Sequence, residues 1–394
     1  MNNAYYSISA VIPTYNSGRF IKDTISSLLI QTIELTEIII VDDYSNDSTR
    51  SLLNELQQLY PQKLKLHFLP ENIGSSEARN IGLRLALEPW VLLMDHDDLA
   101  EPDLVASEWQ RLLELKTQSE HWVLVHSAYQ AITETGEKLS GIHSWQQVEP
   151  EEILGYELIR NRILSNSGVL LNKEVALKVG GFDPSLTYSQ DWDLWLRMAQ
   201  HGGFGYVDKP LVKIRRHGNN TSRIVKNFIE DELQILQKYD LDFIEKAISK
   251  RHLPWELNRT DFVAVLYRMD HWEQGVSLLD DVIVSNPRFS PAYFLKGLYY
   301  LHQKNLNSAR AAFQQTLRIE PNHGAAINNI AGISIIQGEF EGAKNLLTEA
   351  LKLYPNFMDA SHNLNLLNNE VKPDFDDIRF TWRELRPVLV SYVG

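Results

Sequence analysis

The chain has 394 residues, 44% of them apolar, which is enough for two or three domains with cores of their own. The absence of cysteine excludes a disulfide framework and a thiolate metal site. The formal net charge of −13 argues against a general nucleic-acid-binding protein, because such proteins present a basic surface.

The N-terminal residues 1–9 are polar and run directly into an apolar segment, which is unlike a signal peptide. No apolar run in the sequence is long enough to span a bilayer. We therefore expect a cytoplasmic enzyme, with contact at a membrane surface left open.

Strand and helix patterns alternate through the first hundred residues. Apolar runs predict four strands, and 3.6-residue spacing of apolar side chains predicts helices between them. This alternation is typical of an α/β domain with a mostly parallel, Rossmann-like sheet. The predicted strands are 8–13, 37–41, 65–68 and 90–94, and the predicted helices include 19–31 and 77–87.

Polar clusters follow three of these strands, at residues 13–16, 42–45 and 95–98. Ligands of open α/β sheets bind at the carboxyl ends of the strands. We therefore expect the three clusters to meet in one site.

The next part of the chain is less regular. Further strands are predicted at 121–131, 167–171 and 206–215, and a helix at 191–200. The domain is expected to cover residues 1–222, with helical residues 223–255 as a linker to the C-terminal part of the chain.

A 34-residue period begins near residue 256. Pro287, Pro321 and Pro355 each follow an amphipathic helix at this interval, and small residues recur at 275, 309 and 343. This period predicts tetratricopeptide repeats over 256–370, in which each repeat buries its apolar face against its neighbours. The signature tryptophan positions hold Tyr293 and Ile327, which leaves an unrelated array of helical hairpins as the alternative.

Residues 358–370 are expected to form a capping helix, and 371–394 a C-terminal tail. The tail contains a series of apolar residues that would pack on the repeats or form part of an interface. These are Phe380, Trp382, Leu385, Val388 and Val390.

Asp95, Asp97 and Asp98 place three carboxylates within four residues at a predicted strand end. Such carboxylates repel one another unless a cation or solvent lies between them, so a metal site and a solvated turn are both consistent with the pattern. His217 follows the strand 206–215 and is a candidate to complete a site built from oxygen ligands. A lone surface histidine is the alternative.

Asp191 stands at the start of the predicted helix 191–200. It is a candidate general base, and its alternative role is an N-terminal cap of that helix. Tyr15 is a candidate to stack on a nucleotide base, or else an ordinary packing residue. Asp42 and Asp43 have a similar alternative, because capping of the next helix also explains them.

These motifs resemble, in their order, the family 2 glycosyltransferases of the GT-A fold. The resemblance covers about residues 7–222. It rests on VIPTYN at 11–16, IVDDYSNDST at 40–49, NIGSSEARNIG at 72–82, DHDD at 95–98, GGFD at 180–183 and QD at 190–191. Gln190 departs from the glutamate that many relatives carry before the base.

The resemblance implies a role for each matching residue. Pro13, Tyr15 and Asp43 would hold the nucleobase, most often uracil, and Arg79 would lie near the base or the phosphates. Asp95 would approach the ribose or the sugar. Asp97 would bind Mn²⁺ or Mg²⁺ that bridges the diphosphate, and His217 would approach the metal or the diphosphate.

The resemblance also implies that Asp191 is the base of a single in-line displacement, which inverts the anomeric configuration. Trp192 and Trp195 are candidates for the acceptor wall, and core packing is their alternative. The sequence therefore predicts an inverting glycosyltransferase with a nucleotide-sugar donor, most often a UDP-sugar.

The acceptor is open at this point. Because tetratricopeptide arrays often bind peptides on their concave face, one hypothesis is a peptide or protein acceptor docked by the repeats. The other is a saccharide or lipid-linked saccharide acceptor, with the repeats forming a homodimer. A nucleotidyltransferase and a non-catalytic scaffold are alternatives of other classes. Asp191 argues against the first, because sugar transfer needs a base at the acceptor, and the carboxylates at 95, 97 and 191 argue against the second.

Overall fold

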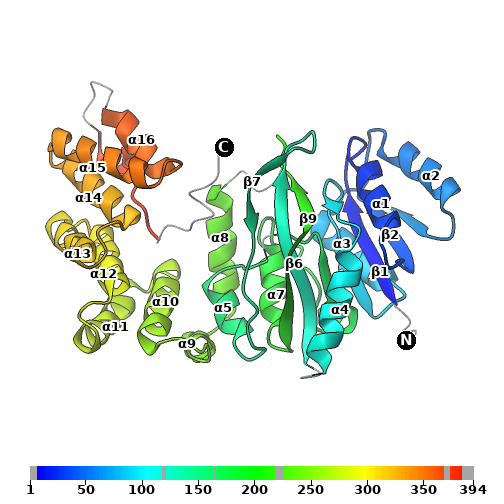
Figure 1. The fold of residues 1–394 in the computed structure, drawn as a ribbon, viewed down its shortest axis with the longest axis horizontal. Coiled ribbons are helices and arrows are strands. Elements are labelled where there is room, and N and C mark those ends of the chain that lie inside the picture. Colours follow the sequence, from blue (N-terminus) through cyan, green and yellow to red (C-terminus); the bar gives the residue numbers. More distant parts are fainter. Residues whose placement is uncertain (1–6, 118–120, 164, 219–224, 368–372, 384–394) are drawn as a thin grey trace. The chain divides into compact units, whose positions relative to one another are not determined.

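The computed structural model describes residues 7–117, 121–163, 165–218, 225–367 and 373–383. The chain divides into two compact units, residues 1–251 and 252–394. We describe each by itself (Figure 1).

The first unit contains a nine-stranded sheet with the order β3-β2-β1-β4-β8-β6-β9-β5, in which β7 pairs with β6. Strands β3, β2, β1 and β4 are mutually parallel, as predicted for the first hundred residues. Beyond them the sheet is mixed, because β8 runs antiparallel to both β4 and β6, and β5 and β7 pair antiparallel with their neighbours. The strands are β1 Ile8–Thr14, β2 Glu37–Asp42, β3 Leu64–Phe68, β4 Trp90–Leu93, β5 Leu99–Ala100, β6 Trp122–Ile132, β7 Lys138–His143, β8 Val169–Asn172 and β9 Gly203–Arg215.

The strand directions gather the polar segments at one edge of the sheet. Strands β1, β2, β4 and β6 point the same way, and β9 is parallel to β6. The carboxyl ends of all five therefore lie at one edge, where the antiparallel β8 begins. The segments after β1, β2, β4 and β9 meet there, although residues 14 and 215 are far apart in the sequence.

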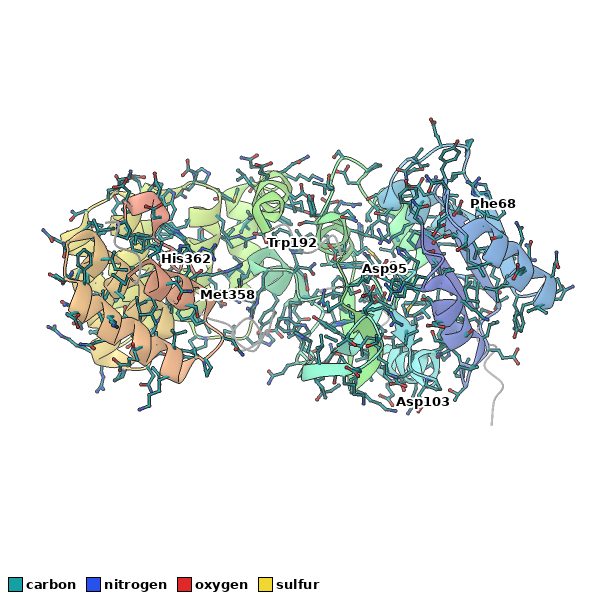
Figure 2. The ribbon with its side chains drawn as sticks, turned by 90° about the horizontal axis from the view of Figure 1, so that it is seen from above. Phe68, Asp95, Asp103, Trp192, Met358 and His362 are labelled. Carbon is teal, nitrogen blue, oxygen red and sulfur yellow. The ribbon has the colours of Figure 1, made fainter. Side chains whose placement is uncertain are left out.

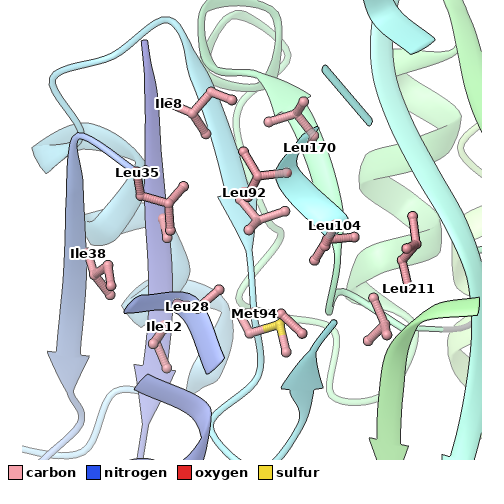
Figure 3. Packing of buried hydrophobic residues seen from close by; sticks show 14 of the residues in the cluster. Ile8, Ile12, Leu28, Leu35, Ile38, Leu92, Met94, Leu104, Leu170 and Leu211 are labelled. Carbon is pink, nitrogen blue, oxygen red and sulfur yellow. The ribbon is translucent and has the colours of Figure 1, made fainter. Parts of the chain in front are cut away.

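Helices cover both faces of the sheet (Figure 1). In the fully buried β1, Ile8 and Ile12 join one apolar cluster and Val11 joins the other. Figure 3 shows Ile8 with Leu92 of β4 and Leu170 of β8 in the first cluster. The helices of this unit are α1 Ile21–Leu29, α2 Thr49–Leu59, α3 Ser75–Leu85, α4 Leu104–Lys116, α5 Ile153–Ile159, α6 Lys173–Lys178, α7 Gln190–Met198, α8 Val225–Leu236 and α9 Leu241–Ser249.

Helices α8 and α9 belong to the first unit, in the region that the sequence suggests as a linker. Asp231 of α8 accepts hydrogen bonds from the backbone N–H groups of Tyr188 and Ser189, at 2.7 and 3.1 Å. Helix α9 packs on α5. Helix α8 therefore fixes the loop that leads into α7.

The second unit is a stack of helices with one apolar core. Ala309 and Ala343 are fully buried, and a Cβ on Gly275 would lie 2.6 Å from the ring of Tyr267. Small side chains at the 34-residue interval thus allow paired helices to approach closely. The helices are α10 Trp255–Arg268, α11 Trp272–Ser285, α12 Ser290–His302, α13 Leu306–Ile319, α14 Gly324–Ile336, α15 Phe340–Leu353 and α16 Met358–Leu367.

The start of the C-terminal tail packs on the repeats. Ile378 and Phe380 are buried in the apolar core of the second unit, and Trp382 contacts the ring edge of Trp272. Leu385, Val388 and Val390 lie outside the described residues. Within the described ranges, no helix is long and apolar enough to cross a membrane.

Candidate active site

The first side of the candidate site is formed by the segments that follow β1 and β2. Pro13 lies inside β1, and the ring of Tyr15 is 45% exposed just beyond the strand. Asn16 and Tyr44 have positive φ angles of 49° and 65°, and the N–H of Asn16 donates to Ser45 Oγ at 2.8 Å. The two segments are thus held together with aromatic rings left accessible for a planar ligand.

Asp43 is 3% exposed and organises the loop before α3. Its two carboxylate oxygens accept the N–H groups of Ile73 at 2.7 Å and Gly74 at 2.9 Å. Gly74 has a φ of 90°, a conformation that favours glycine. A hydrogen bond between Asp43 and a nucleobase would therefore have to use an oxygen that already accepts a backbone N–H. This is feasible because each carboxylate oxygen has a second lone pair.

Asp42 has a different environment from Asp43. It is fully buried and accepts the Nε–H of Arg50 at 2.5 Å. The Arg50 guanidinium also lies over the rings of Tyr44 and Phe68, the latter labelled in Figure 2. Asp42 therefore stabilises the end of β2.

Arg79 joins α3 to the end of β4. Its Nη2 donates to Asp95 Oδ1 at 2.7 Å, and its guanidinium lies 5.5 Å from the centre of the Phe182 ring. In the part of the chain that the structure describes, its buried Nε and Nη1 have no hydrogen-bond partner. Because an unsatisfied buried donor is costly, these groups are suited to an anionic or carbonyl oxygen of a ligand.

Asp97 and His217 lie in contact, although 120 residues separate them. His217 Nε2 is 2.8 Å from Asp97 Oδ2, and both side chains are mostly buried. The imidazole stacks on the ring of Phe20 with a centroid distance of 5.1 Å. Arg215 Nε donates to the backbone oxygen of Asp97 at 2.8 Å, which fixes the same turn from β9.

The donor set of this pair fits a hard divalent cation in part. Carboxylate oxygen is the kind of ligand that Mg²⁺ and Mn²⁺ prefer, whereas imidazole nitrogen is more typical of Zn²⁺, Fe²⁺ or Cu²⁺. Within the described ranges, no group of three or more His, Asp or Glu side chains is arranged to hold an ion. Mg²⁺ commonly takes one or two carboxylates together with substrate phosphates, so Asp97 and His217 fit as a partial ligand set that a diphosphate completes.

Asp98 has a structural role, which the sequence pattern does not distinguish from the roles of Asp95 and Asp97. It is 3% exposed, and it accepts hydrogen bonds from Ser167 Oγ at 2.5 Å and from the Arg215 N–H at 2.8 Å. Burial raises the pKa of Asp98 well above its ordinary value, and the charges of Asp97 and Asp95 add to the rise. Asp98 therefore connects the end of β4 to the ends of β8 and β9.

Asp191 lies at the start of α7 and belongs to the same site. Burial raises its pKa to about 6, while the Trp192 N–H and the charge of Arg79 lower it and the charge of Asp95 raises it. The N-cap position is Ser189, so Asp191 does not cap the helix in the usual way. Its Oδ1 accepts the N–H of Trp192 at 2.7 Å.

Trp192 and Trp195 do not form the suggested acceptor wall. They are 2% and 0% exposed, and the indole N–H of Trp192 donates to the Glu157 carbonyl at 2.7 Å. Trp195 packs edge-on against Phe182 in the core. The spacing of the two tryptophans along α7 does not show whether their face of the helix is exposed or buried. In the tertiary fold this face packs into the core.

A segment that the sequence reading missed flanks Asp191. Asn161 Nδ2 lies 3.3 Å from Asp191 Oδ2, and the neighbouring Arg160 and Arg162 both lie over the ring of Trp145. The signal in the sequence is the two arginines on either side of Asn161. This segment, rather than the two α7 tryptophans, provides a polar group beside the candidate base.

Comparison with known proteins supports both predicted resemblances. Residues 9–178 match the profile described as Glycosyl transferase family 2, and residues 300–364 match a Tetratricopeptide repeat profile. An uncharacterized glycosyltransferase of Rickettsia typhi is 27% identical over 225 residues, which are 57% of this chain and 68% of that protein. Chondroitin synthase of Escherichia coli is 27% identical over 219 residues, covering 55% of this chain and 30% of that protein.

The fold is also similar to a solved structure. The crystal structure of S. aureus TarS 1–349 in complex with UDP-GlcNAc aligns with a TM-score of 0.51 and 17% identity. The alignment covers 84% of this chain and 92% of that chain. The GT-A fold predicted from the sequence is thereby confirmed for the first unit, together with the helical repeats that follow it.

The burial of Trp195 leads to a stability prediction. Trp195→Ala should lower the free energy of unfolding of the first unit by about 3–5 kcal/mol, because it leaves a large cavity in the core. Urea denaturation followed by circular dichroism measures this. The control is Tyr60→Ala in the same unit, whose side chain is 41% exposed and whose removal should cost much less. Equal midpoints for the wild type and Trp195→Ala would contradict the core assignment.

Proposed function

We propose that this protein is a family 2 glycosyltransferase, as the match over residues 9–178 supports, and that it transfers a sugar from a nucleotide diphosphate donor to an acceptor hydroxyl. The observation that carries the proposal is the convergence of Arg79, Asp95, Asp97, Asp191 and His217 at one edge of the sheet. Arg79 contacts Asp95 and acts electrostatically on Asp191, and Asp97 contacts His217.

The donor side of the site has the groups that a nucleotide diphosphate needs. Tyr15 offers an exposed ring to the base, with Pro13 and Asp43 beside it. We propose uracil as the base, as the family resemblance implies. Asp95 holds the Arg79 guanidinium in place, so that the Nε and Nη1 groups of Arg79 can donate hydrogen bonds to the nucleotide sugar. The second carboxylate oxygen of Asp95 is then left for the ribose or the sugar.

A divalent cation is part of the proposal. Asp97 and His217 would hold Mn²⁺ or Mg²⁺ together with oxygens of the diphosphate, and the cation supplies charge neutralisation to the leaving group. In the described structure the Arg215 side chain fixes the Asp97 turn, and the Phe20 ring fixes the imidazole plane. Both contacts orient the two side chains toward each other.

Asp191 is proposed as the general base. With a pKa near 6 it is mostly ionised at neutral pH and is still basic enough to accept a proton. The acceptor oxygen bonds to the anomeric carbon, the bond from that carbon to the diphosphate oxygen breaks, and the acceptor proton passes to the Asp191 carboxylate. One displacement of this kind inverts the anomeric centre. Asn161 holds the carboxylate in place.

For the acceptor, we propose a peptide or protein docked by the repeats. The support is that the repeats hold an extended segment of the chain itself through its backbone, by hydrogen bonds with Asn329 and Asn363. The alternative is a saccharide or lipid-linked saccharide acceptor.

A thermal-shift screen of nucleotide sugars in the presence of Mn²⁺ tests the donor proposal. A ligand at 100 times its dissociation constant adds about 2.7 kcal/mol to the stability of the folded state, which is a measurable shift. Stabilisation by one or more UDP-sugars is expected. If no nucleotide sugar stabilises the protein with or without Mn²⁺, the transferase proposal fails.

Asp97→Ala tests the cation site. Mn²⁺ should increase the affinity of the wild type for UDP. In the presence of Mn²⁺, Asp97→Ala should bind UDP at least roughly tenfold more weakly than the wild type, because removal of even an outer partner of a metal ligand costs that much. Calorimetric titration of UDP with and without Mn²⁺ measures this. Asp103→Ala is the control, because Asp103 is 54% exposed and forms a surface ion pair with Lys209. Unchanged Mn²⁺ dependence in Asp97→Ala would refute the ligand role.

Asp191→Asn tests the base. The amide retains the shape of the side chain, so donor affinity should stay near that of the wild type. Turnover, measured as UDP released from the donor found in the screen, should fall by roughly 10²–10⁴-fold. Turnover within a few-fold of the wild type would exclude Asp191 from the chemistry.

The pKa of Asp191 also predicts a pH dependence. The base must be deprotonated, so kcat/KM for the donor should rise with pH through about 6 and fall about tenfold per unit below it. The hydrogen bond from Asn161 lowers the pKa of Asp191, so Asn161→Ala should move this acid limb to higher pH. A flat profile between pH 5 and 7, or a shift of the limb to lower pH, would contradict the assignment.

A further inference from the structure

The tail segment 378–382 is held against α14 and α16 by side-chain amides. Asn329 donates from Nδ2 to the Thr381 carbonyl at 2.9 Å and accepts the Thr381 N–H at 2.7 Å. Asn363 makes the same two bonds to Arg379, both at 2.9 Å. Each carboxamide therefore pairs with both backbone groups of one residue, as a neighbouring β-strand does.

These asparagines follow the repeat period. Asn329 and Asn363 are 34 residues apart and occupy equivalent positions in successive repeats. The residues before them, Asn328 and His362, also contact the tail: Asn328 Nδ2 lies 2.9 Å from the Arg379 carbonyl, and His362 Nε2 lies 3.0 Å from that of Asp377. His362 of α16 is labelled in Figure 2. Two successive repeats therefore bind the backbone of the tail through equivalent positions.

The side chains of the segment alternate in burial. Ile378 and Phe380 are buried, and the Arg379 side chain between them is exposed. Gly332 of α14 makes room for both apolar side chains, because a Cβ there would lie 2.7 Å from the Phe380 ring and 2.8 Å from an Ile378 methyl group. Thr381 adds a hydroxyl that donates to Asp359 Oδ2 at 2.9 Å.

The amides need an occupant of this kind. With the tail in place, Asn328, Asn329 and Asn363 are all fully buried, and a carboxamide buried under a chain segment is destabilising unless that segment satisfies its hydrogen bonds. The backbone of an extended segment satisfies the donor and the acceptor of Asn329 and of Asn363 together, while Asn328 Oδ1 accepts a hydrogen bond from Asn363 Nδ2 at 2.9 Å. The contacts involve backbone atoms, two alternate apolar side chains and one hydroxyl, so another peptide with this pattern would make the same contacts.

We propose that the face of α14 and α16 that carries Asn328, Asn329 and Asn363 is a binding site for extended peptides, which residues 378–382 occupy in cis. A partner peptide with apolar residues at two alternate positions, followed directly by a threonine or serine, displaces the tail. The tether gives the tail an effective concentration on the order of millimolar, so the site admits only tight or abundant partners. Peptide binding at this face does not depend on whether the first unit transfers a sugar.

A substitution in the tail of the full chain tests the proposal. Thr381→Pro removes the N–H that donates to Asn329 and the hydroxyl that donates to Asp359, and it leaves the residues of the groove unchanged. The probe is a fluorescein-labelled peptide with the sequence of residues 374–383, DFDDIRFTWR. In fluorescence anisotropy, Thr381→Pro should bind this probe at least about tenfold more tightly than the wild type, because about tenfold is the factor for each hydrogen bond lost by the competing tail.

Matched changes separate recognition from general loosening of the fold. The same threonine-to-proline change in the probe should weaken its binding to Thr381→Pro by the same factor, at least about tenfold. Adding Gly332→Ala to Thr381→Pro should also abolish binding, whereas adding Gly342→Ala should not, because a Cβ at Gly342 meets open space. Phe380→Ala replaces Thr381→Pro if the latter chain does not fold.

Two results would overturn the proposal. One is a folded tail variant, with a helical circular dichroism spectrum like that of the wild type, that binds the probe no better than the wild type does. The other is a wild-type chain that light scattering shows to be a dimer and that Thr381→Pro converts to a monomer. That outcome would make the tail of a second copy, rather than the tail in cis, the occupant of the groove.

Discussion

The buried carboxylate of Asp98 is the interaction on which the geometry of the candidate active site depends. Its two oxygens accept bonds from Ser167, just before β8, and from the backbone of Arg215, at the end of β9. Ser167 Oγ in turn accepts the N–H of Asp95, and the Arg215 side chain binds the carbonyl of Asp97. A single buried group therefore positions the Asp95–Asp97 turn, and His217 follows two residues after Arg215.

The charges around this turn are incompletely balanced, and the imbalance is suited to a ligand. Arg79 neutralises one oxygen of Asp95 and keeps two buried donor groups available within the described structure. Asp191 is close enough to both residues for its pKa to respond to their charges. The proposed cation and diphosphate would add both positive and negative charge at this edge and so satisfy the carboxylates and the guanidinium together.

The repeat unit applies the same principle to a neutral ligand. Its buried amides, like the buried donors of Arg79, are favourable only when a partner satisfies them. In the described structure the chain itself provides that partner for Asn329 and Asn363. If the acceptor is a peptide, its docking then competes with the tail, and access to the repeats becomes a controllable step of the proposed reaction.

The sequence by itself determined the features that depend on local pattern. Apolar runs ending in polar clusters locate β1, β2 and β4, and prolines 34 residues apart locate the helices of the repeats. Tertiary structure alone decided which partners distant residues have. It made β8 antiparallel, turned Trp192 and Trp195 into the core, gave Asp98 a structural role beside Asp97, and directed Asn329 and Asn363 to the tail. The reason is physical: periodicity specifies an amphipathic face, but what that face contacts depends on segments far away in the chain.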